Sequence, residues 1–191
     1  MISGWVILLK KIKFTNKLPE ELYKTVTRNF QRRIVNVNSI DEIWAADLIN
    51  MQAFSKDNNG IKYLLTVIDI FSKFVWIVYL QRKTGQEIAN AFTWILKERR
   101  PSETWVDGGR EFYNKDIHKL VELNSTENKE KSYVIERFNR TIKEKMFMYF
   151  SANNTRKYVD VLDLLEDQFN NTTHSSIKMT PKEVSRNENE K

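Results

Sequence analysis

Three runs of apolar and β-branched residues lie in the first half of the chain, each bounded by turn sequences. They span residues 43–51 (IWAADLINM), 63–71 (YLLTVIDIF) and 74–80 (FVWIVYL), and their composition favours strands. Asn59-Gly60 lies between the first two runs and only Ser72-Lys73 separates the last two. Such turn signals and short connections predict three consecutive antiparallel strands.

The hydrophobic period then changes from two to between three and four. Thr84 and Glu87 have the spacing of a capping box, and the helix that they open extends to Pro101, which cannot continue it. A short strand is predicted at 103–107 (ETWVD), then a helix at 115–123 that Asn114 caps. The polar stretch 124–131 (NSTENKEK) is predicted to be a loop.

Three more helices follow this loop. Residues 132–150 carry apolar side chains at helical spacing, and a further apolar face starts after Thr155, a candidate cap. Thr180 and Glu183 form a second capping box, with Pro181 at the first helical position. Residues 20–30 have a weaker helical pattern.

This element order predicts an α/β domain. Its mixed sheet has three antiparallel strands plus one or more parallel strands, and helices flank it. We divide the chain into a basic lead-in arm (1–40), a core (41–174) and a short C-terminal helix with a charged tail (175–191).

The helix at 132–150 has two distinct faces. Six apolar residues form one stripe that must pack on another element: Val134, Ile135, Phe138, Ile142, Met146 and Tyr149. Beside it lies a mixed-charge edge of Glu136, Asn139, Arg140 and Lys143. The structural interpretation is ion pairing four residues apart on a solvated helix. The functional interpretation depends on the acids elsewhere in the chain.

Composition narrows the possible partners and cofactors. The chain has 191 residues, no cysteine and two histidines, which excludes a disulfide framework and a thiolate zinc site. The net charge of +6 favours a polyanionic partner. The longest apolar run, 74–80, is too short to cross a bilayer, so we expect no membrane partner.

Three acidic residues are candidates for one metal site. Asp47 lies inside an apolar strand, Asp107 ends a short strand, and Glu136 begins the helix that packs on the sheet. Ligands of open α/β sheets lie beyond the carboxyl ends of the strands, and convergent carboxylates suit a pair of Mg²⁺ or Mn²⁺ ions. The alternative is chance, because the chain has 25 acidic residues. Asp69 is predicted to be structural and to bond groups near Ser72.

Five stretches together resemble the catalytic core of retroviral-type integrases. They are IWAADL, VIDIFSKFVWIVYL, WVDGGREFYN, SYVIERFNRTIK and FNNTTHSSIKMTPKEV. The resemblance covers about residues 34–184 and is greatest to integrases of Polinton (Maverick) transposons and of retrotransposons. It implies a ribonuclease H-like fold, DNA integration, and an enzyme of the DDE class that carries out 3′-end processing and strand transfer.

Under this resemblance, Asp47, Asp107 and Glu136 are the catalytic residues and the ligands of two Mg²⁺ or Mn²⁺ ions. Arg140 and Lys143, with Asn139 and Arg137, are the implied DNA-binding residues. The implied partners are the DNA ends of a mobile element, target DNA and further copies of the chain, and the implied location is the nucleus.

The sequence departs from this pattern in two places. Gly108-Gly109 follows Asp107 where the family has a single glycine, and the loop after it is short. Only 28 residues, 108–135, separate Asp107 from Glu136, whereas the retroviral spacing is about 35. The fifth strand is therefore expected to be missing or shortened. An alternative function stays open, a catalytically decayed DNA-binding remnant with the same fold. Ribonuclease H itself is disfavoured by the pattern at Arg140 and Lys143.

Overall fold

The computed structural model describes residues 36–187 except 108, 110, 114 and 126–132. Residues 1–35 of the lead-in arm, with the weak helix at 20–30, therefore lie outside the described residues, as does the proposed cap at Asn114. Within the described residues, no helix is long and apolar enough to cross a membrane.

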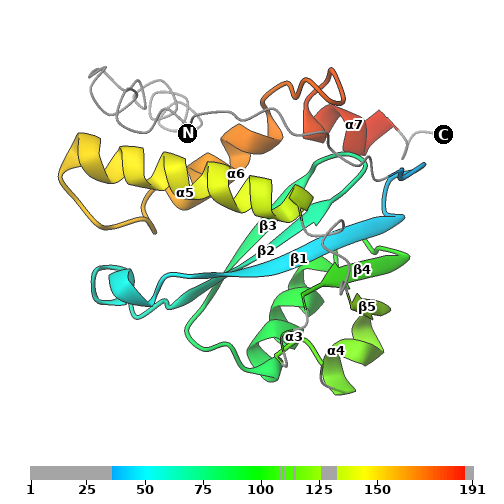
Figure 1. The fold of residues 1–191 in the computed structure, drawn as a ribbon, viewed down its shortest axis with the longest axis horizontal. Coiled ribbons are helices and arrows are strands. Elements are labelled where there is room, and N and C mark those ends of the chain that lie inside the picture. The colour runs from blue at the N-terminus through cyan, green and yellow to red at the C-terminus, as the bar shows by residue number, and fades with distance from the viewer. Residues whose placement is uncertain (1–35, 108, 110, 114, 126–132, 188–191) are drawn as a thin grey trace, which may run out of the picture.

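A five-stranded sheet forms the centre of the molecule, in the order β3-β2-β1-β4-β5 (Figure 1). The bounds are β1 Ile43–Asn50, β2 Tyr63–Asp69, β3 Val75–Leu80, β4 Glu103–Val106 and β5 Leu123–Ser125. β1, β2 and β3 are antiparallel, whereas β4 is parallel to β1 and β5 is parallel to β4. The predicted mixed sheet is confirmed, with strand ends within two residues of those predicted.

Helices cover both faces of this sheet (Figure 1). On one face lie α5 (Tyr133–Asn153) and α6 (Leu162–Asn170), and on the other α3 (Gly85–Ile95) and α4 (Lys115–Leu120). Because successive side chains of a strand point to opposite faces, the core has two parts, one on each face of the sheet. Ala45 and Ile49 pack with the α5 layer, whereas Trp44 and Ala46 pack with the α3 layer.

Both predicted caps are present, and the capping box at Thr180 is complete, whereas Glu87 accepts from the N–H of Gln81 and Arg82 and not from that of Thr84. The backbone N–H of Glu87 donates to Thr84 Oγ1 (3.3 Å) at the start of α3. At α7 (Pro181–Asn187), the N–H of Glu183 donates to Thr180 Oγ1 (3.1 Å) and Glu183 accepts from the N–H of Thr180 (2.9 Å). α3 ends at Ile95, earlier than the sequence predicts, and turns lead from there toward Pro101.

The helix predicted from Thr155 begins only at Leu162. The residues before Leu162, which were predicted to be helical, bind another partner. The side chain of buried Asn58 accepts from the backbone N–H of Tyr158 (2.6 Å) and of Val159 (3.2 Å). Asn58 comes from the loop after η1 (Gln52–Asp57), a 3-10 helix that the sequence pattern did not indicate. A contact about a hundred positions away therefore overrides the local pattern.

The segment after α4 also differs from the prediction. The helix predicted at 115–123 ends at Leu120, and residues 123–125 form β5 by pairing with Thr104, Trp105 and Val106. The expectation of a loop from residue 124 is therefore wrong for two residues. Backbone pairing with β4 is sufficient for a strand where few apolar side chains are available. The fifth strand is present and shortened.

Asp69 is structural, as predicted. Its carboxylate accepts from Ser72 Oγ (2.6 Å) and from the N–H of Phe71 (3.1 Å). The sequence did not indicate its other partner, Arg99, whose Nη2 lies 2.6 Å from both Asp69 and Asp41. Arg99 also donates to Ser185 Oγ (3.0 Å), which ties α7 to the sheet.

Candidate functional site

Asp47 and Asp107 are brought together by the pairing of β1 and β4. The last pair in the parallel register is Ala46 with Val106, so the two aspartates are the next residues on neighbouring strands. Both alternate onto the face that α5 covers, as their neighbours Ala45 and Trp105 do. Asp107 directly follows β4, at the carboxyl end where α/β sheets bind ligands.

The Asp47 carboxyl group is half-buried, and this has an electrostatic consequence. Burial raises its pKa above the usual value, and the nearby charge of Asp107 raises it further. Hydrogen bonds from the N–H of Leu48 and from Asn139, together with the charge of Lys143, act in the opposite direction. The site therefore brings two carboxylates together, and the N–H of Leu48, Asn139 and Lys143 offset only part of their negative charge.

Asn139 on α5 holds Asp47 directly. It is 6% exposed, and its Nδ2 donates to Asp47 Oδ2 at 2.7 Å. This orientation of the amide follows from the carboxylate, because only the NH₂ group can donate to it. The Asn139 Oδ1 atom is buried and has no hydrogen-bond partner among the described residues. Asn139 therefore faces the aspartates, whereas the sequence suggested a contact with DNA.

The other predicted residues of α5 lie along its exposed edge. Glu136 is exposed in the first turn of the helix, three residues before Asn139. Arg140 is exposed. Lys143 is half-buried, and its charge acts to lower the pKa of Asp47. Arg137 is exposed on the opposite flank of the helix and lines a separate cavity.

The predicted triad is only partly assembled. Asp47 and Asp107 are adjacent, but within the described part of the chain no group of three Asp, Glu, His or Cys residues has the arrangement to hold a metal ion. Glu136 is on the correct helix without being grouped with the two aspartates. The structure thus unites two predicted acids with Asn139 and Lys143.

Sequence reasoning missed two residues beside Asp107. The N–H of Gly109 donates to Asp107 Oδ1 (3.1 Å). A Cβ atom at Gly109 would lie 2.9 Å from Asp107 Oδ1 and 3.0 Å from Glu111 Oε2, so glycine lets both carboxylates approach the backbone. Glu111 lies 3.6 Å from Lys83 Nζ. The sequence feature that could have indicated these contacts is the second glycine of WVDGGREFYN, which is a departure from the family pattern.

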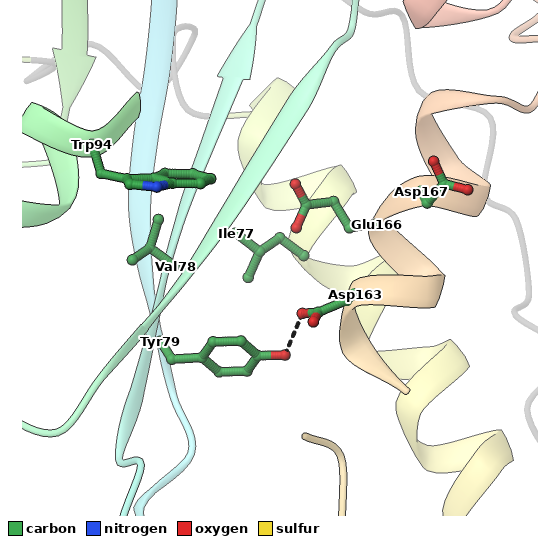
Figure 2. A pocket seen from close by; sticks show the side chains of 7 residues that line it. All are labelled: Ile77, Val78, Tyr79, Trp94, Asp163, Glu166 and Asp167. Carbon is green, nitrogen blue, oxygen red and sulfur yellow. Dashed lines mark hydrogen bonds between the residues drawn. The ribbon is translucent and has the colours of Figure 1, made fainter. Parts of the chain in front are cut away.

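A second concave region lies at the edge strand β3, away from the aspartates. A cavity of about 540 Å³ is lined by Tyr79, Trp94 and three acids of α6 (Figure 2). Tyr79 donates to Asp163 at 2.5 Å, and the N–H of Ile77 bonds Glu166. Burial, and then the charges of Asp163, Glu98 and Asp167, raise the pKa of Glu166 to about 8. These side chains cover the unpaired edge of β3.

Comparison with known proteins gives one relative in sequence. No protein-family profile matches the chain. It is 36% identical over 143 residues to a transposon-derived protein of Caenorhabditis elegans, in an alignment that covers 71% of this chain and 50% of that protein. The chain thus spans about half the length of this curated relative.

Three solved structures similar to this chain contain retroviral proteins. A chain of the simian T-cell lymphotropic virus intasome, in complex with PP2A regulatory subunit B56 gamma, gives a TM-score of 0.68 at 19% identity and covers 84% of this chain and 60% of that one. The HTLV-2 integrase catalytic core with magnesium gives 0.61 at 16% identity (76% and 97% covered). The BIV integrase catalytic core gives 0.61 at 17% identity (78% and 97%).

These similarities agree with the fold derived above. The chain has the ribonuclease H-like fold of retroviral integrase catalytic cores, which the sequence motifs predicted.

Proposed function

We propose that this chain is the catalytic core of a metal-dependent enzyme that cuts and joins DNA during integration of a mobile element. The observation that carries the proposal is the side-by-side placement of Asp47 and Asp107 under α5. The shared fold of integrase cores and the transposon-derived relative support it. The net charge of +6 suits a polyanionic substrate.

The residues of the site fit a hard divalent cation. Two carboxylates lie together. Burial is the main cause that raises the pKa of Asp47, and the charge of Asp107 adds to it, a repulsion that a bound cation relieves. Oxygen ligands suit Mg²⁺ or Mn²⁺. We propose that Asp47 and Asp107 hold the ions and that Glu136 completes the set. Two bound ions would supply Lewis-acid activation of an attacking oxygen and stabilise the leaving one.

The protein's own residues position the reactants. Asn139 fixes the Asp47 carboxylate by its 2.7 Å hydrogen bond. We propose that Arg140 and Lys143 bind phosphate oxygens of a DNA strand beside the acids, where they offset negative charge on the reacting phosphodiester. Binding through phosphates predicts affinity that falls steeply with salt.

Two observations favour a second candidate function, a DNA-binding remnant without catalysis. Among the described residues Glu136 is not grouped with Asp47 and Asp107, and β5 has only three residues. A remnant would retain the net positive charge and the fold while lacking a complete metal site.

Nicking and joining of a branched DNA substrate in Mg²⁺ or Mn²⁺ separates the two functions. The enzyme predicts activity that Asp107→Asn and Glu136→Gln abolish while DNA affinity stays within about twofold, because neither change removes a cation. Asp57→Asn, at an exposed position on η1, is the matched control and should retain activity. Salt-sensitive DNA binding without any metal-dependent product would favour the remnant.

We further propose that the chain self-associates and works in the nucleus, where chromosomal target DNA lies. The related viral integrases occur in an intasome and in a trimeric form. Light scattering with and without branched DNA tests self-association, and microscopy of a tagged chain tests location.

A further inference from the structure

A cavity of about 470 Å³ lies beside α5, on the flank away from Asp47. Tyr133, Arg137 and Thr141 line it from α5, at spacings of four residues that place them in one row. Lys73 of the β2–β3 turn and Ser176 of the segment after α6 line it from other elements. Its volume is within the range of small-ligand sites.

Aromatic rings form much of the wall of this cavity. Phe138 and Phe169 contact each other edge to face, with ring centroids 4.8 Å apart. His174 packs against Phe169 at 4.4 Å, and its Nε2 lies 3.3 Å from the Phe169 carbonyl oxygen. Ile68 adds an aliphatic surface. Such a wall suits a flat, apolar group of a ligand.

The polar groups of the cavity are cationic or neutral. Arg137 is exposed at its rim, and Lys73 is half-buried, with its Nζ 2.5 Å from the Ile70 carbonyl oxygen. Burial lowers the pKa of Lys73, and the nearby Asp69 charge opposes this. Among the described residues, none that lines the cavity is acidic. An anionic ligand with a flat apolar part therefore suits it better than a cation.

The cavity is connected to the candidate site by the geometry of α5. Successive residues of a helix are about 100° apart, so the row of Arg137 and Thr141 lies on one flank, and Asn139 and Lys143 lie on the other. The exposed Arg140 lies between the two flanks. A helix is about 10 Å across, so a strand crossing its exposed side passes from the aspartates to the cavity.

We propose that this cavity binds one unpaired nucleotide of the DNA substrate, with its phosphate on Arg137 and Lys73. Its base would lie against the half-buried rings of Tyr133 and His174, and the buried rings of Phe138 and Phe169 support this surface. This inference rests on the proposed function, because it assumes that DNA lies across α5. Aromatic stacking with cationic phosphate contacts is how proteins hold unpaired nucleotides. It predicts that the substrate has a single-stranded extension or a frayed end beside the reacting phosphodiester.

The test compares a blunt duplex with a duplex that carries a short single-stranded extension, by fluorescence anisotropy. Ser176→Trp fills the cavity from an exposed position, and Ser175→Trp, at an exposed neighbouring position that does not line it, is the matched control. Ser176→Trp should weaken binding of the extended duplex about tenfold, the size of one base stacked on an aromatic ring. Binding of the blunt duplex should change less than twofold.

Two further measurements sharpen the result. Arg137→Gln should weaken the extended duplex more than the blunt one, whereas Arg156→Gln, an exposed arginine beyond the other end of α5, should not distinguish them. A photoreactive 5-iodouracil in the extension should crosslink to Tyr133, Phe169 or His174. Equal effects on both duplexes, or crosslinks only elsewhere, would overturn the cavity's role while leaving the proposed function intact. Absence of binding to either duplex would overturn both.

Discussion

Glu166 gives the most quantitative prediction, because its pKa is raised to about 8 from an ordinary value of 4.5. The side chain projects from α6 toward edge strand β3 (Figure 2), where it accepts from the N–H of Ile77. Burial is the main cause of the shift, and the carboxylates of Asp163, Glu98 and Asp167 add to it. Glu166→Gln keeps the shape and the acceptor oxygen while removing the titration.

The sign of the change in the free energy of unfolding with pH follows from proton linkage. Because the folded protein holds the Glu166 proton up to about pH 8 and the unfolded chain loses it near pH 4.5, the free energy of unfolding falls as pH rises between these values. Each pKa unit corresponds to about 1.4 kcal/mol, so the interval from pH 4.5 to 7 gives about 3.4 kcal/mol. We halve this to about 2 kcal/mol for solvent screening at a half-buried group.

Urea unfolding followed by tryptophan fluorescence between pH 5 and 8 measures the effect. Wild type should lose stability across this range relative to Glu166→Gln, and the variant should be about 2 kcal/mol more stable at pH 7 and nearly equal at pH 5. Glu122→Gln, an exposed carboxylate beside β5, is the control and should follow wild type. A variant that is destabilised equally at both ends of the range would refute the reasoning.

Three further predictions concern single contacts. Asn58→Ala should lower the free energy of unfolding by about 3 kcal/mol, measured by urea unfolding, because its side chain also donates to the carbonyls of Phe54 and Arg156. Arg99→Met should lower it by about 3 kcal/mol, since buried Asp69 would lose its cation; Arg100→Met should not. Gly109→Ala should reduce strand-transfer activity at least tenfold with little change in thermal stability, because the Cβ displaces the Asp107 carboxylate.

The strands and the start of α3 were predictable because they depend on local sequence. β-branched runs, short turns and the box of Thr84 with Glu87 indicate their own structure without reference to the rest of the chain. The start of α6 was not predictable in this way, since Asn58 binds the backbone of Tyr158 and Val159 from about a hundred residues away. β5 was missed because its pairing with β4, and not a pattern of its own, makes it a strand.

The candidate site also contains one feature that the sequence predicts and one that depends on tertiary packing. That Asp47 and Asp107 would be neighbours follows from one parallel pairing of two strands, whereas the role of Asn139 depends on how α5 is rotated about its axis. Asn139 lies at the border between the apolar stripe and the charged edge, and the sequence prediction placed it on the charged edge with the DNA-binding residues. The rotation follows from the apolar stripe of α5, which packs in the core, and the hydrogen bond from Asn139 to Asp47 agrees with it. This rotation places Lys143 near Asp47 and Arg137 on the far flank, where it lines the cavity beside α5.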